Sequence, residues 1–321
     1  MDCCATLWRF CGKLTAICVL SVLGASTAAA QLRGHNIPGD YGLQSGTQAP
    51  PGIYVVYLGW FYTSDAIKTA QGDEVRASST LTTVAQGPGL TWALPKRLFG
   101  AHVGGTAAFP FLKNQIEANS LDVDSPMKYS DTYIQPFQLG WHFKRGDIVT
   151  GYGIFLPTGK FEPGGTDNSG LGMYSHEISL GTTLHLDAEK AWHAAVLGAY
   201  EIHTKKKDID QTVGDLVTLE GGLGRSFYTK VNGPLPFITN VGLAAYAQFK
   251  ATSDSGSAIP ASLQGKRDRI FAAGPEMNIF IPKVKLTLGG RFLPEFRGRL
   301  HTQGKTFVIS AAYVLKPFAR R

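Results

Sequence analysis

From Gly52 onward the chain repeats one pattern, in which apolar residues alternate with small or polar ones and each run ends in turn-forming residues. We count twelve such runs. They cover residues 53–62, 75–93, 98–114, 129–143, 147–156, 174–187, 191–203, 215–228, 236–250, 268–281, 284–297 and 305–318. A tilted strand crosses a bilayer with about 9–11 residues, and single-chain bacterial barrels have an even number of strands. The pattern predicts an all-β fold, a 12-stranded antiparallel transmembrane β-barrel of the bacterial outer-membrane type, over residues 52–318.

The connections between the runs alternate in length. Those after even-numbered runs are mostly short: residues 94–97, 144–146, 188–190 and 282–283. Those after odd-numbered runs are mostly long and polar: residues 63–74, 115–128, 157–173, 204–214 and 251–267. The turn near residues 231–234 is longer than its class. Short periplasmic turns and long extracellular loops produce this alternation, whereas a soluble sandwich or propeller has no reason to sort its loops. It places both termini in the periplasm.

The first 30 residues read as a secretory signal peptide. Arg9 and Lys13 precede an apolar stretch over residues 14–23, and Ala28 to Ala30 offer a cleavage site before Gln31. All four cysteines lie within the first 18 residues, so the mature chain has none. An exported protein without disulfides fits a closed barrel, and we expect an outer-membrane location.

Within the runs, charged residues fall on the face opposite the leucines and aromatics. The set is Glu177, Glu201, Glu220, Glu276, Glu295, Arg291 and Lys285. A charge facing lipid near the midplane costs about 2–4 kcal/mol, so these side chains should face the lumen. Twelve strands leave a narrow channel or a plugged lumen. The charged set therefore reads either as a salt-bridge network that stiffens the barrel or as a polar lining along the path of a solute.

Searches for other chemistry return little. The eight histidines are scattered and the mature chain lacks thiolates, so we expect no metal, no cofactor and no catalytic residue. An outer-membrane hydrolase needs histidine and serine on one face of a strand, but His176 and Ser179 are three apart and point to opposite faces. The excess of basic residues is spread over turns and loops, which excludes nucleic acid and fits a surface that faces lipopolysaccharide.

Five segments of the chain resemble a known family. They are HNIPGDYGLQSGT at 35–47, PPG at 50–52, GYG at 151–153, PTGKF at 157–161 and TLEGGLGRSF at 218–227. Together they resemble the outer-membrane transporters of the phenol-degradation meta-pathway (MetA-pathway) family, also called SphA-like. The C-terminus departs from a clean outer-membrane signature, because Phe318 is followed by Ala319-Arg320-Arg321.

The resemblance implies a passive channel for uptake of hydrophobic or aromatic small molecules, phenol-type compounds among them. It also implies outer-membrane lipid, lipopolysaccharide and the barrel-assembly machinery as partners. A structural or adhesion barrel and, further behind, an outer-membrane hydrolase remain as alternatives.

The resemblance also suggests a role for the N-terminal periplasmic segment, residues 31–51. It precedes the first strand and contains many glycines and prolines, so it can follow an irregular path. As in the hydrophobic-compound channels that the family resembles, we expect it to act as a plug or gate, with Pro38, Gly39, Asp40 and Tyr41 at its centre. A flexible linker is the alternative.

Overall fold

The computed structural model describes residues 33–75, 79–118, 121–231, 235–261 and 263–318. The predicted signal peptide, Gln31 and the last three residues lie outside this part of the chain. Within it, no helix is long and apolar enough to cross a membrane.

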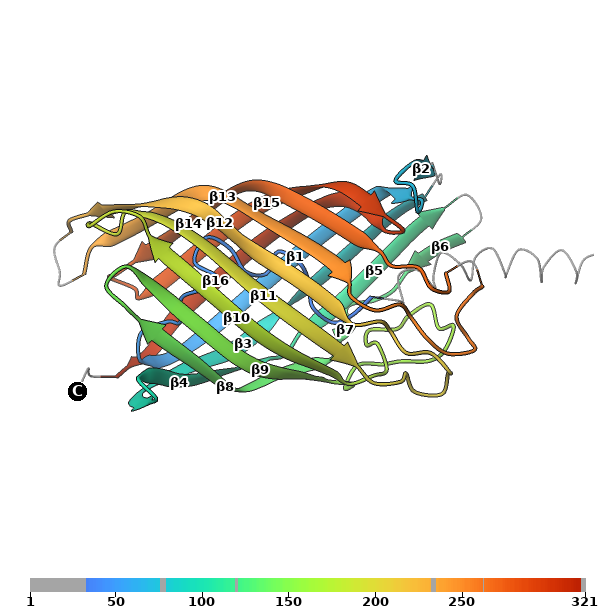
Figure 1. Cartoon of the computed structure of the whole chain (residues 1–321), viewed down its shortest axis with the longest axis horizontal. Coiled ribbons are helices and arrows are strands. Elements are labelled where there is room, and N and C mark those ends of the chain that lie inside the picture. The colour runs from blue at the N-terminus through green and yellow to red at the C-terminus, as the bar shows by residue number, and fades with distance from the viewer. Residues whose placement is uncertain (1–32, 76–78, 119–120, 232–234, 262, 319–321) are drawn as a thin grey trace, which may run out of the picture.

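The strands of the described part of the chain form one closed antiparallel sheet (Figure 1). Its strands are β1 Gly52–Lys68, β2 Glu74–Val75, β3 Ser79–Leu98, β4 Ala101–Ala108, β5 Phe111–Ala118, β6 Leu121–Asp124, β7 Lys128–Tyr129, β8 Thr132–His142, β9 Gly146–Leu156, β10 Ser175–His185, β11 Trp192–His203, β12 Leu216–Thr229, β13 Phe237–Lys250, β14 Arg269–Ile281, β15 Leu286–Arg299 and β16 Thr302–Pro317. Each long strand pairs with its sequence neighbours, and β1 pairs with both β3 and β16, which closes the barrel. Because β4 and β5 occupy one position in the wall and β2, β6 and β7 are short additions, the barrel has twelve strand positions, which confirms the predicted fold.

The third wall position is divided between β4 and β5. Residues Phe109 and Pro110 interrupt it, and Pro110 has no N–H to contribute to a ladder. The Phe109 N–H instead donates to the Pro88 carbonyl at 3.0 Å. Before the break, β4 pairs with β8. After it, β5 pairs with β6 and β7 in the long connection that follows.

The first short turn lies later in the chain than the sequence pattern predicts. Residues 94–97 belong to β3, and the turn is formed by Phe99 and Gly100, with φ of 51° and 81°. A two-residue hairpin turn with positive φ at both positions matches the twist of the flanking strands. The proline at position 95 marks an irregularity in the strand, since the register shifts between Ala93 and Arg97, and does not mark its end.

The two ends of the barrel differ, as the connection lengths predict. The short turns and the C-terminal strand end gather on the left in Figure 1, and the long loops on the right. Gly52 pairs with Pro317 at the short-turn end. Arg33, however, lies at the long-loop end, where it donates to Thr302 at the start of β16. The prediction that both ends of the mature chain lie at the short-turn side therefore does not hold for Arg33, because residues 33–51 run through the barrel.

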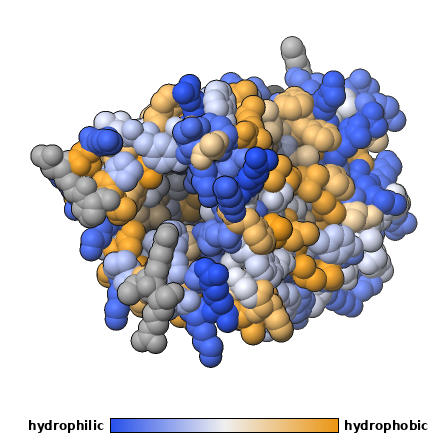
Figure 2. Space-filling model, turned by 60° about the vertical axis from the view of Figure 1, so that its left-hand side comes forward, coloured by the Kyte–Doolittle hydropathy of each residue, from blue (hydrophilic) through white to orange (hydrophobic). Residues whose placement is uncertain are grey.

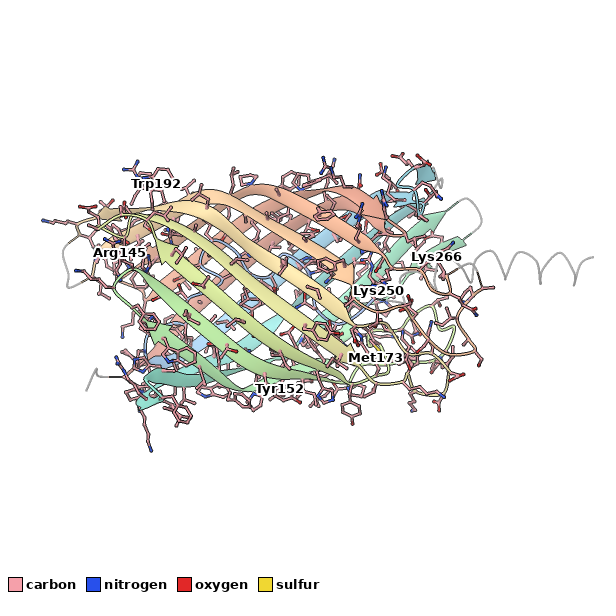
Figure 3. All side chains as sticks on the ribbon, in the orientation of Figure 1. Arg145, Tyr152, Met173, Trp192, Lys250 and Lys266 are labelled. Atoms are coloured by element: carbon pink, nitrogen blue, oxygen red, sulfur yellow. The ribbon has the colours of Figure 1, made fainter. Side chains whose placement is uncertain are left out.

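The wall is apolar outside, and much of its inner face is polar. On β10, Ile178, Leu180 and Leu184 are 56%, 63% and 51% exposed, while Glu177 and Ser179, which alternate with them, are buried. Figure 2 shows hydrophobic side chains over the wall and hydrophilic ones gathered towards its ends. Aromatic residues occur at strand ends, as Trp192 does at the start of β11 in Figure 3. This is the exterior of a membrane-embedded barrel.

Candidate functional site

Residues 33–51, which we call the lumen segment, run inside the barrel from the long-loop end to the start of β1. The segment begins where Arg33 stacks over the Tyr62 ring, at 5.6 Å from its centroid. It ends near the short turns, where Gln48 donates to the Gln138 carbonyl at 3.5 Å. It forms no strand with the wall, and Figure 1 shows it as an irregular blue path within the barrel.

Three wall glutamates accept the backbone N–H groups of the lumen segment. Glu201 accepts from His35 at 2.7 Å and from Asn36 at 3.0 Å. Glu220 accepts from Tyr41 at 2.9 Å, and Glu276 accepts from Leu43 at 3.2 Å. Buried backbone N–H groups need acceptors, and a segment without a strand partner must find them elsewhere. The carboxylates thus take the place of a sheet ladder.

The other predicted lumen residues contribute in different ways. Glu177 accepts from the Asn36 side chain at 2.7 Å and from the Tyr133 hydroxyl at 3.0 Å. Arg291 donates to the Gly39 carbonyl at 3.1 Å, and its Nε lies 3.5 Å from Glu276.

Two charged residues of the predicted set differ from the others, since neither has a hydrogen bond to the described part of the lumen segment. Glu295 accepts from the hydroxyls of Tyr62 and Tyr246, at 3.0 and 2.7 Å, and therefore links wall strands to one another. Lys285 lies exposed in the turn before β15, with φ of 54°, so its predicted place among the lumen residues is wrong. The alternation rule does not apply to Lys285 because β15 begins at Leu286, the residue after it.

The four residues predicted at the centre of the plug all contact the wall. The Pro38 carbonyl accepts from the Trp60 indole at 3.1 Å. Gly39 has φ of 91°, a conformation that favours glycine. Asp40 faces Arg291 and Glu220. Tyr41 packs against the buried cluster of Val149, Leu197 and Ala199.

Leu43 is wholly buried against a glycine-lined part of the wall. A Cβ atom on Gly222, Gly224 or Gly242 would come within 3.0 Å of its methyl groups. The wall and the segment also meet at Gly46, where a Cβ would lie 2.0 Å from the Thr182 backbone. Gly222 and Gly224 of the segment TLEGGLGRSF therefore make room for Leu43, and the glutamate in it binds Tyr41.

At the long-loop end, His35 joins three parts of the chain that sequence reasoning did not connect. Its Nδ1 lies 2.6 Å from Ser175 Oγ and its Nε2 lies 2.8 Å from Asp131 Oδ2. Its ring stacks on Phe155 with centroids 4.8 Å apart. Asp131 also accepts the N–H groups of Gly159 and Leu171, at 2.9 and 2.7 Å, so the long loop after β9 is tied to the same cluster.

The histidine and serine considered for a hydrolase lie apart. His176 contacts the Tyr152 hydroxyl at 2.7 Å on the outer side of β10, whereas Ser179 is buried on the inner side. Among the described residues, no group of three or more histidine, aspartate or glutamate side chains could hold a metal ion.

A cavity of about 220 Å³ remains between the lumen segment and the wall at the long-loop end. One side of it is apolar, formed by Ile37, Pro38, Trp60, Leu81, Ala85 and Leu112. The other side carries polar groups, among them Asp131, Lys206, Gln248 and His301. Lys206 lies over the Phe161 ring at 5.4 Å, and burial lowers its pKa to about 8.

Three comparisons with known proteins bear on this chain. Residues 64–311 match the family described as MetA-pathway of phenol degradation. No curated protein sequence matches significantly. Among solved structures, an outer-membrane channel from Pseudomonas putida F1 has a TM-score of 0.66 at 14% identity, covering 88% of this chain and all of its own. The β-domain of the Bordetella autotransporter BrkA has a TM-score of 0.48 at 10% identity, covering 83% of this chain and all of its own.

The structural likeness to the Pseudomonas channel agrees with the closed barrel and its apolar exterior, which place the protein in the outer membrane. The family match covers most of the chain, including nine of the long strands in full. This outer-membrane barrel belongs to the MetA-pathway of phenol degradation family.

Proposed function

We propose that the protein is a passive channel through which hydrophobic or aromatic small molecules, phenol-type compounds among them, cross the outer membrane without covalent chemistry. The observation that carries this proposal is the cavity between the lumen segment and the apolar wall of β1, β3 and β5. Membership of a family described by phenol degradation supports the substrate class. The cavity is the place where a solute entering from the long loops would first be bound.

The size and lining of the cavity suit a single aromatic ring. An apolar cavity of about 150 Å³ stays dry and binds benzene, so about 220 Å³ is enough for one ring with a small substituent. Trp60 and Tyr62, stacked with centroids 5.4 Å apart, present aromatic surface on one side. The polar groups on the other side can hydrogen-bond a hydroxyl substituent. A purely polar solute would make no favourable contact with the apolar side.

The lumen segment acts in this proposal as a movable plug. It fills the barrel beyond the cavity and binds the wall mainly through amide–carboxylate hydrogen bonds, each contributing about 1.5–3 kcal/mol. Such contacts can exchange for water when the segment moves. A flexible linker would not bury Leu43 completely or place Gly46 against the wall backbone.

One arrangement favours a second candidate, a hydrolase. Ser175, His35 and Asp131 are hydrogen-bonded in the order found in serine hydrolases. However, Ser175 is wholly buried and does not line the cavity, and its histidine contact uses Nδ1 where the hydrolase arrangement uses Nε2. We therefore assign the three residues to holding the segment in place. Covalent labelling of Ser175 by a fluorophosphonate would overturn that assignment.

The channel proposal is tested by growth at limiting concentrations of single-ring aromatic carbon sources. A deletion strain should grow more slowly than the parent on at least one of them, and the intact gene should restore growth. Ala85→Trp, which fills the cavity from β3, should fail to restore it. Leu219→Trp, on the lipid side of β12, is the matched control and should restore it. A purely structural or adhesion barrel predicts equal growth in every case.

We also propose that lipopolysaccharide surrounds the long loops and that the barrel-assembly machinery inserts the protein into the outer membrane. Support for both comes from the closed barrel and from the sorting of its loops by length.

A further inference from the structure

A basic pocket lies on the rim of the barrel at the long-loop end, outside the lumen. Lys266, Arg267, Arg269 and Arg299 line it together with Phe249 and Phe271. The four cations are exposed. They come from the loop before β14 and from the ends of β14 and β15, and Figure 3 shows Lys266 at this end.

Two of these arginines stand directly opposite one another. Arg269 on β14 pairs with Arg299 on β15 across the antiparallel ladder. Like charges in directly opposed positions destabilise a sheet. Within the described residues, none of these four exposed cations forms an ion pair, whereas Lys250, the fifth cation that lines the pocket, is paired with Asp254. Arg267 donates to the Ala251 carbonyl at 2.8 Å, which holds it in place without neutralising it.

The acidic residues nearby do not balance this charge. Asp268 also lines the pocket, but its one carboxylate faces four exposed cations. Asp254 is already bound to Lys250, with oxygens 2.6 and 2.7 Å from its Nζ. The pocket therefore carries a net positive charge that calls for an anion from outside the chain.

The surface below the pocket is apolar. Phe271 stacks with Phe296, at 6.3 Å between centroids, on the lipid-facing side of β14 and β15. The cations therefore lie where the hydrocarbon exterior meets the loops, at the level of lipid headgroups. Arginine fits this setting because its guanidinium binds phosphate through two parallel hydrogen bonds.

We propose that this pocket binds a phosphate group of an outer-leaflet glycolipid, with Arg269 and Arg299 holding the phosphate and Lys266 and Arg267 at its edge. The acyl chains would then extend along Phe271 and Phe296. The inference rests on the proposed placement of the long loops at the cell surface and is independent of the solute that the channel carries.

The test is binding of bis-phosphorylated lipid A to the purified barrel in detergent, measured by native mass spectrometry. The double variant Arg269→Gln/Arg299→Gln should bind it at least tenfold more weakly. Lys144→Gln/Arg145→Gln removes the same charge at the short-turn end, where Figure 3 shows Arg145, and should bind as the parent does. Without lipid, the single variant Arg299→Gln should melt at a higher temperature than the parent, because the opposed pair is relieved.

Equal affinity in the parent and the double variant would overturn the proposal, as would an equal loss in the short-turn control. If millimolar inorganic phosphate displaced the lipid completely, the lipid assignment would be wrong and the pocket would be a site for free anions. Ala85→Trp should bind lipid A normally, so failure of the channel proposal and failure of the lipid site are distinguished.

Discussion

Replacing Leu43 by alanine should release the lumen segment without unfolding the barrel. Leu43 is wholly buried, and its methyl groups fill the space left by Gly222, Gly224 and Gly242. Leucine-to-alanine changes in such sites cost about 2–5 kcal/mol. Because the wall glycines cannot move in to fill the gap, we expect a value within that range. Each 1.4 kcal/mol is a factor of ten, so the docking equilibrium of the segment should shift by about 30-fold or more.

Single-channel recording in planar bilayers measures this shift as the frequency of openings. Leu43→Ala should open about 30-fold more often than the parent or beyond. Leu43→Met keeps the volume and should change the frequency by less than about tenfold. Leu223→Ala, on the lipid side of the same wall strand, is the matched control for losing a leucine and should open as the parent does. An unchanged opening frequency in a correctly assembled Leu43→Ala barrel would refute the plug.

Three further predictions concern the segment and the loop above it. Gly46→Ala should leave the barrel heat-modifiable on a gel but prevent the lumen segment from binding the wall, because the new Cβ would meet the Thr182 backbone at 2.0 Å. A protease should then cleave within residues 33–48 of the variant and not of the parent. Glu201→Gln should weaken the outer end of the segment by about 1–3 kcal/mol, seen as faster hydrogen exchange at the His35 amide, and exchange at the parental rate would contradict it. Burial lowers the pKa of Lys206 to about 8, so between about pH 8 and 10.5 the unfolded loop after β11 binds a proton that the folded loop does not. The folded loop should therefore become more stable as pH rises through this range. Hydrogen exchange of the loop amides measures this stability, and Lys206→Met should remove its pH dependence.

The barrel follows from local information in the sequence. Side chains alternate between faces along a strand, so apolar and polar positions report the wall directly, as at Ile178 and Glu177. Loop lengths sort the two ends for the same local reason. Turn chemistry is less decisive: Pro95 suggested a turn, whereas the positive φ values at Phe99 and Gly100 placed it two residues beyond the predicted connection.

The contents of the lumen were decided only by the tertiary structure. The inward parity of Glu201 and Glu220 follows from the alternation, but their hydrogen bonds to His35 and Tyr41 span 166 and 179 residues, and no period in the sequence links such positions. His35, Ser175 and Asp131 come from three separate segments and meet only when the lumen segment lies inside the closed wall. The path of that segment depends on shape and hydrogen-bond complementarity with a surface formed by strands across the barrel. Local periodicity determines which side chains form the wall, whereas the path of the lumen segment is determined only by the closed barrel.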